Sequence, residues 1–110
     1  MSAITFALLL IAGHYVADFA MQNQFVADMK GKVGVDPHGI HALTAHAMHH
    51  ATVAGIAAFA VGAPWIAVAL AVGVTHWLID YAKADRNMFG VHVDQALHIA
   101  VLLTVAVVWS

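Results

Sequence analysis

Four long apolar segments dominate this chain and restrict it to very few folds. They cover residues 3–28, 40–61, 65–83 and 92–109, and stretches containing glycine, proline or charged residues separate them. Of the 110 residues, 63% are hydrophobic and 9% are charged, whereas a soluble domain has about 25% charged residues. A helix that crosses a bilayer needs about 20 mostly apolar residues. The sequence therefore predicts an all-α fold, an integral membrane four-helix bundle with four transmembrane helices in a single domain, 1–110.

The first apolar segment begins close to the N-terminus, where a signal peptide is the competing interpretation. No basic residue precedes the apolar run, and His14 and Asp18 interrupt it. A signal peptide has a basic start and an uninterrupted apolar centre. We therefore expect a retained transmembrane helix.

Basic residues predict how the bundle is oriented in the membrane. All of them lie in or beside the first and third connections between segments, namely Lys30, Lys32, Lys83 and Arg86. The second connection, residues 62–64, carries no charge. Because loops rich in lysine and arginine stay on the cytoplasmic side, we expect connections one and three in the cytoplasm and both termini on the opposite side.

Each apolar segment carries one pair of metal-competent side chains spaced four residues apart. The pairs are His14 and Asp18, His46 and His50, His76 and Asp80, and Asp94 and His98. This spacing places both members on one face of a helix. An aspartate deep in a bilayer costs about 2.5 to 3.5 kcal/mol and by default marks a functional site facing the bundle interior. The sequence therefore predicts that the four pairs converge on one site.

These residue types favour a divalent metal, with all eight as candidate ligands. The chain contains no cysteine, so only nitrogen and oxygen ligands are available. Ligands projecting from several helices into one core are typical of dimetal bundles. Imidazole and carboxylate groups suit zinc first, then iron or manganese.

Several of these residues also have simpler interpretations. Each pair alone is compatible with a hydrogen bond that neutralises its aspartate, and Asp94 also suits the first turn of a helix. His49 is the alternative to His50 as a ligand. We expect His38, His41 and His92 to be surface residues. Four further residues are candidates for contacts behind the ligands or with substrate, namely Gln22, Gln95, Lys30 and Lys83, although the lysines also suit the membrane flank.

These motifs together resemble a family of small bacterial and phage integral-membrane proteins, the domain of unknown function 3307 family. The resemblance covers essentially the whole chain and rests on His14-x-x-x-Asp18-Phe19-x-x-Gln22, Lys30, His46, His76-x-x-x-Asp80-x-x-Lys83 and Asp94-Gln95-x-x-His98. It implies a multi-pass protein of the bacterial inner (cytoplasmic) membrane. More distantly, the helical His-x-x-x-Asp pairs resemble those of membrane-bound metal-dependent hydrolases and of helical zinc phospholipases and nucleases.

Three classes of function remain open. The leading hypothesis is a metal-dependent hydrolase of a phosphoester or lipid-linked substrate at the cytoplasmic leaflet, with Asp80 or Asp94 as the catalytic carboxylate and Lys30, Lys83 or Arg86 near the headgroup. The second is a divalent-cation or proton transporter or channel, although the apolar second halves of segments two and three argue against it. The third is a non-enzymatic membrane interaction protein, phage-encoded and acting through oligomeric contacts. The expected partner is the lipid bilayer, a homo-oligomer is compatible with the sequence, and no nucleic acid partner is expected.

Overall fold

The computed structural model describes residues 2–84 and 90–110, and within them all regular secondary structure is helical. Arg86 and the rest of the predicted third connection up to residue 89 lie outside the described residues. The elements in order are α1 (Ala3–Tyr15), the π-helical turn η1 (Val16–Ala20), α2 (Gln24–Met29), α3 (Gly39–Val61), α4 (Trp65–Ala84) and α5 (Val91–Trp109).

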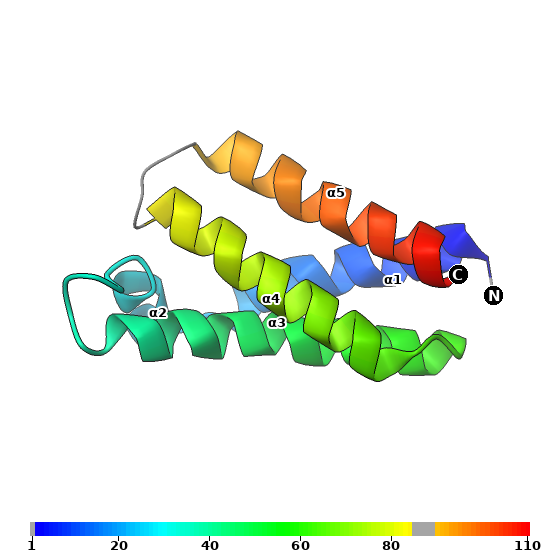
Figure 1. Ribbon diagram of the computed structural model, residues 1–110, viewed down its shortest axis with the longest axis horizontal. Coiled ribbons are helices and arrows are strands. Elements are labelled where there is room, and N and C mark those ends of the chain that lie inside the picture. The colour runs from blue at the N-terminus through cyan, green and yellow to red at the C-terminus, as the bar shows by residue number, and fades with distance from the viewer. Residues whose placement is uncertain (1, 85–89) are drawn as a thin grey trace.

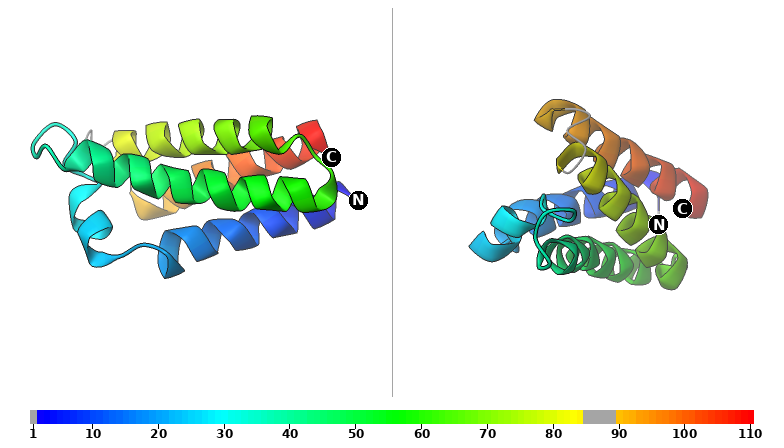
Figure 2. Two further views of the ribbon diagram at one scale, coloured as in Figure 1. Left: turned by 90° about the horizontal axis from the view of Figure 1, so that it is seen from below. Right: turned by 60° about the vertical axis from the view of Figure 1, so that its left-hand side comes forward.

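The four long helices lie alongside one another as an antiparallel bundle (Figures 1 and 2). Helices α3 and α5 each pack on both α1 and α4, so the four helices form a ring. Both termini and the turn between α3 and α4 lie at one end, and the connection between α2 and α3 lies at the other. The end of α4 and the start of α5 are also at that second end.

The first apolar segment is helical from Ala3 to Ala20 and then breaks, so the helix predicted over 3–28 does not continue to residue 28. After α1, the Met21 N–H donates to the Val16 carbonyl at 3.0 Å, which closes a π-helical turn. Asn23 then adopts an extended backbone, and its side chain accepts a hydrogen bond from the Val26 N–H at 2.9 Å. Asparagine is favoured at helix N-termini because it satisfies a free amide there. Asn23 therefore starts the separate short helix α2.

Three helical segments are long and apolar enough to cross a membrane, by length and composition. They are Ala3–Ala20, Trp65–Lys83 and Val91–Trp109. Helix α3 has 23 residues but does not join this group. By this measure three of the four predicted spans qualify, and α3 does not. Its mean hydropathy is lowered by four histidines, namely His41, His46, His49 and His50.

Small residues bring α3 and α4 into close contact. A Cβ atom added to Gly73 would lie 2.9 Å from the Cβ of Ala51, and one added to Gly55 would lie 3.3 Å from the Cβ of Ala69. Both glycines belong to the four-residue spacing of small residues that favours close packing of membrane helices. The interface therefore depends on the absence of these side chains.

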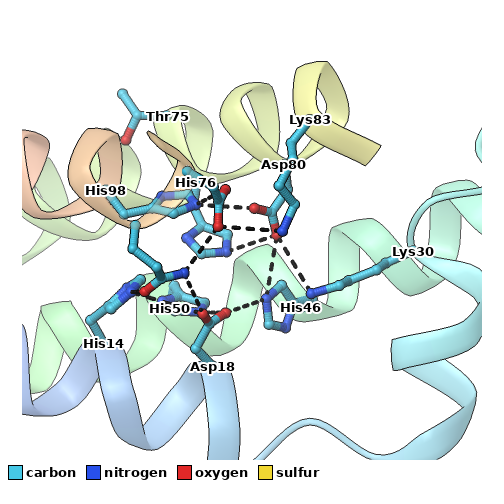
Figure 3. A network of polar contacts seen from close by, with 12 residues as sticks. His14, Asp18, Lys30, His46, His50, Thr75, His76, Asp80, Lys83 and His98 are labelled. Carbon is cyan, nitrogen blue, oxygen red and sulfur yellow. Dashed lines mark hydrogen bonds and ion pairs between the residues drawn. The ribbon is translucent and has the colours of Figure 1, made fainter. Parts of the chain in front are cut away.

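The bundle interior has an apolar half and a polar half. Apolar side chains fill the half toward the termini, where Phe6, Leu10, Val68, Leu102 and Val105 are at most 5% exposed. Polar side chains fill the half toward the basic connections (Figure 3). Large apolar side chains also cover the outside, including Leu8, Phe59, Leu70 and Val107. The molecule is thus apolar outside and locally polar within, as expected of a chain surrounded by lipid.

Candidate metal centre

All the buried polar or charged side chains in the described part of the chain belong to the predicted ligand set. They are His14, His46, His50, His76, Asp80, Asp94 and His98, each at most 4% exposed. The eighth predicted ligand, Asp18, is nearly buried, with a side chain 12% exposed. Figure 3 shows the side chains from all four long segments pointing toward one another. The convergence predicted from the four-residue spacing is therefore found in the structure, whereas their role as ligands stays a prediction.

Asp80 joins three helices at the centre of the cluster. Its Oδ1 lies 3.0 Å from Nε2 of His98 on α5. Its Oδ2 lies 3.1 Å from Nε2 of His76, one turn away on α4, and 3.4 Å from Nε2 of His46 on α3. The carboxylate thus faces imidazoles from α3, α4 and α5.

Asp18, which follows α1, likewise lies close to imidazoles from another helix. Its Oδ1 lies 3.0 Å from Nε2 of His46 and 3.4 Å from Nε2 of His50, both on α3. His14, the partner of Asp18 in the four-residue pair, is more distant, with Nε2 3.9 Å from Oδ2. Because Asp18 lies within the π-helical turn η1, it does not follow the α-helical register of His14. Its closest histidines therefore come from another helix.

Three imidazoles from three helices form a stacked row. The ring centroids of His50 and His76 are 3.6 Å apart, and those of His76 and His98 are 4.1 Å apart, with interplanar angles of 19° and 20°. This row brings together imidazoles from α3, α4 and α5. His76 occupies the middle position.

Several ligand-type atoms in the cluster have no hydrogen-bond partner among the described residues. They include Nε2 of His50, Nε2 of His76, Oδ2 of Asp80 and Oδ1 of Asp94, all buried. Buried polar atoms in proteins are almost always hydrogen-bonded, so each exception requires an explanation. The imidazole nitrogens do lie 3.1 to 3.4 Å from carboxylate oxygens, but without hydrogen-bond geometry.

The donor atoms fit divalent metal ions. One set comprises Asp18, His46, His50 and His76, and a second comprises His76, Asp80 and His98, and within each set the ligand atoms lie within 4.8 Å of one another. A tetrahedral zinc ion with bonds of about 2.0 to 2.1 Å holds its ligands roughly 3.4 Å apart. His14 and Asp94 adjoin these sets without belonging to either.

Gln95 and two lysines surround the ligand atoms. Gln95 accepts a hydrogen bond from Nε2 of His14 through Oε1 at 3.0 Å, and its Nε2 donates to Asp18 and Asp94. Nζ of Lys83 lies 3.3 Å from Oδ2 of Asp94. Nζ of Lys30 lies 3.9 Å from Oδ2 of Asp80. Three of the four residues predicted to lie behind the ligands are thus in contact with them.

The remaining predicted residues are not among the contacts described around Asp18 and Asp80. Oε1 of Gln22 is buried without a hydrogen-bond partner in the described residues, and the same holds for Nδ1 of His49. His50, rather than His49, is the neighbour of Asp18. His38, His41 and His92 are exposed, as the sequence predicted.

In the first connection, the backbone N–H of His38 donates to Asp36 at 2.8 Å, which together with the His38 side chain lowers the pKa of that carboxyl.

The centre leaves room for an ion or a single water, not for a substrate. A cavity of about 10 Å³ is bounded by His14, His50, His76 and His98 together with apolar side chains. A cavity of roughly 10 to 15 Å³ is the smallest that accommodates a water molecule. The partly exposed side chains around the cluster include Asp18, Lys30 and Lys83, which are 12%, 16% and 25% exposed.

Sequence reasoning missed the π-helical turn and the pairing between helices. Neither has a clear signal in the sequence, since four-residue spacing describes only one helix at a time.

Comparison with known proteins gives one result. No curated protein and no solved structure matches the chain, and the more distant similarity to membrane-bound hydrolases is not shown. A family model described as protein of unknown function (DUF3307) matches residues 5–110. The chain, matched over nearly its whole length, belongs to the DUF3307 family.

Proposed function

We propose that this protein is a membrane-embedded, metal-dependent hydrolase whose His/Asp cluster holds one or two divalent ions, with zinc preferred. The supporting observation is the group of buried ligand atoms without hydrogen-bond partners among the described residues: Nε2 of His50, Nε2 of His76, Oδ2 of Asp80 and Oδ1 of Asp94. Each lies 3.1 to 3.4 Å from an imidazole nitrogen or a carboxylate oxygen without hydrogen-bond geometry, and a buried polar atom without a hydrogen bond costs about 1 to 3 kcal/mol. A cation among them removes that cost.

The two ligand sets suggest different roles. The set of Asp18, His46, His50 and His76 supplies four donors, as in closed structural zinc sites. The set of His76, Asp80 and His98 supplies three donors, as in catalytic zinc sites that keep one position open. His76 is shared by both sets, and because a neutral imidazole has one lone pair it completes only one of them at a time. Asp94 lies beside this second set, with Oδ1 3.1 Å from Nε2 of His98. A bound divalent ion in such a site acts as a Lewis acid and lowers the pKa of a coordinated water. Asp94 is placed to hold the proton, with Asp80 as the second candidate.

We propose that α3 is the fourth membrane span. Two of its four histidines, His46 and His50, face the interior, where they are at most 3% exposed. The outer face carries apolar side chains, with Met48, Ile56 and Phe59 each more than 60% exposed. The mean hydropathy of α3 is low partly because of two buried histidines, so the face that α3 would turn to lipid is more apolar than this mean suggests. With four spans, the basic connections lie in the cytoplasm and the protein resides in the bacterial inner membrane.

The position of the cluster supports hydrolysis rather than transport. A cation pathway lines a bundle with polar groups across its depth. Here the other half of the interior is filled by apolar residues such as Phe6, Leu10, Leu102 and Val105. The centre therefore serves one leaflet. The proposed substrate is a phosphoester or a lipid-linked molecule that approaches from the cytoplasmic leaflet.

Metal analysis tests the proposal first. Protein purified in detergent, stripped with chelator, and refilled with zinc, iron(II) or manganese in turn is expected to retain between one and two equivalents of its preferred metal. Retention well below one equivalent of every metal would end the metal hypothesis.

An activity assay follows on metal-loaded protein. A chromogenic phosphodiester is expected to be hydrolysed by the native protein and not by Asp80→Asn. Tight metal binding without hydrolysis of any phosphoester or lipid-linked ester would leave a metal-binding protein and refute the enzyme.

A further inference from the structure

We infer that Lys30 and Lys83 form an anion-binding subsite at the open end of the centre, and that this subsite takes a phosphate group once the carboxylates hold metal. The inference rests on the proposed function and extends it by assigning the substrate a phosphate anion. It concerns residues for which flanking the membrane is the simpler interpretation of the sequence.

Two separate elements bring the lysines to the same place. Lys30 is the residue that ends α2, which packs on α3, and Lys83 lies in the last turn of α4. Their side chains are 16% and 25% exposed, and their ammonium groups lie beside Asp80 and Asp94, respectively. Lys32, only two residues after Lys30, is exposed. Figure 3 shows Lys30 and Lys83 both reaching toward the carboxylates. This inward orientation differs from that of a lysine that only marks the membrane surface.

The formal charge of the cluster depends strongly on metal. Asp18, Asp80 and Asp94 supply three negative charges, and Lys30 and Lys83 supply two positive ones, so with neutral histidines the sum is minus one. One divalent ion changes this sum to plus one, and two ions change it to plus three. A buried excess of charge is costly unless a counterion accompanies it.

The arrangement of donors suits phosphate in particular. Lysine binds phosphate as a point charge, and here two ammonium groups come from α2 and α4. When Asp80 turns its oxygens to a metal ion, it no longer neutralises Lys30 fully, and Lys83 lies nearby beside Asp94. With two ions bound, a phosphate dianion beside the ions and the lysines lowers the sum from plus three to plus one, and with one ion bound a phosphate monoanion brings it to zero. The same chemistry applies to free phosphate and to a lipid headgroup.

Linkage between metal and phosphate tests the inference. We would measure the affinity of the detergent-solubilised protein for zinc by competition with a chromophoric chelator, with and without inorganic phosphate, correcting for the zinc that phosphate binds alone. Coupling of about 1 to 3 kcal/mol between two ligands corresponds to roughly 5- to 150-fold in affinity. We expect phosphate to raise the zinc affinity of the native protein about tenfold.

Matched variants show whether the lysines carry this coupling. In the double variant Lys30→Met and Lys83→Met, zinc is still bound and the phosphate effect falls below about twofold. The double variant Lys30→Arg and Lys83→Arg keeps both charges and most of the coupling. Lys32→Met removes one charge outside the site and leaves the coupling unchanged. Gel filtration and thermal unfolding verify that each variant is folded, and if the methionine variant does not fold, the single variants Lys30→Met and Lys83→Met must each reduce the effect.

The outcomes separate this inference from the proposed function. Zinc binding without an effect of either inorganic phosphate or a phosphomonoester lipid, or an effect that persists in the methionine variant, overturns the subsite and leaves the metal centre intact. Failure to bind zinc, iron or manganese overturns both.

A second arm identifies the source of the phosphate group. Native protein in nanodiscs of phosphatidylcholine is compared with protein in nanodiscs that also contain phosphatidate, a phosphomonoester lipid. A higher zinc affinity with phosphatidate assigns the subsite to a lipid headgroup. An effect of soluble phosphate alone assigns it to a soluble phosphorylated molecule, and no effect of either overturns the inference.

Discussion

His98 on α5 and Asp80 on α4 meet across a helix interface, with Nε2 of the histidine 3.0 Å from Oδ1 of the aspartate. The two residues are 18 positions apart, and both are at most 4% exposed. The pair therefore exists only because the bundle brings the two helices together at this register. Removing either partner leaves the other buried with one close contact fewer, which makes the pair a sensitive point for testing the centre.

Asp80→Asn should abolish tight metal binding while leaving a folded, membrane-inserted protein. Asparagine keeps the shape of aspartate and removes a buried charge, whose insertion into the membrane is costly. Loss of a group behind a ligand already lowers metal affinity 10- to 100-fold, so we expect a loss of at least about 100-fold from chelator competition. Asp36→Asn, the same change in the first connection, is the control. A zinc affinity within threefold of the native protein would refute Asp80 as a ligand.

Histidine substitutions should distinguish the two ligand sets. His76 belongs to both sets, so His76→Ala should weaken both sites, whereas His46→Ala should affect the first set and His98→Ala the second. The measurement is the number of bound zinc equivalents at increasing chelator concentration. The exposed residue His38 supplies the control, and His38→Ala should bind like the native protein. Equal losses in all three variants would argue for a single mixed site.

Single cysteines should establish the orientation, because the chain has none of its own. Val35, 86% exposed in the first connection, and Ser110, at the opposite end of the bundle, are suitable positions. In cells with a permeabilised outer membrane, an impermeant maleimide should label Ser110→Cys directly and Val35→Cys only after lysis. Labelling of Val35→Cys from outside would reverse the orientation derived from the basic residues.

Gly73→Leu should destabilise the bundle by separating α3 from α4. Even a Cβ atom at Gly73 would lie 2.9 Å from the Cβ of Ala51, and overpacking of this kind costs about 1 to 3 kcal/mol. Val74→Leu adds bulk at a neighbouring position of the same helix that is 56% exposed, and should change little. Thermal unfolding followed by circular dichroism in detergent compares the two. Equal unfolding midpoints would show that the close contact is not needed.

The sequence alone determined the helical class and the membership of the polar cluster. Long apolar runs permit only helices in a bilayer, since every backbone amide must be satisfied within its own segment. A buried aspartate or histidine in such a run has to face the interior. For this reason the eight candidate ligands, His50 in preference to His49, and the exposed positions of His38, His41 and His92 all followed from composition and spacing.

Only the tertiary structure decided how the eight residues pair. Four-residue spacing places two side chains on one face of a helix, but it contains no information on the rotation and register of that helix against its neighbours. Those are set by contacts such as Gly73 with Ala51, which follows His50 in the chain but involves no polar side chain. The π-helical turn that carries Asp18 and the break at Asn23 that starts α2 and leads to Lys30 depend on local backbone hydrogen bonds that periodicity does not reveal. The grouping around Asp18 and Asp80, with His76 between them, is therefore a property of the folded bundle.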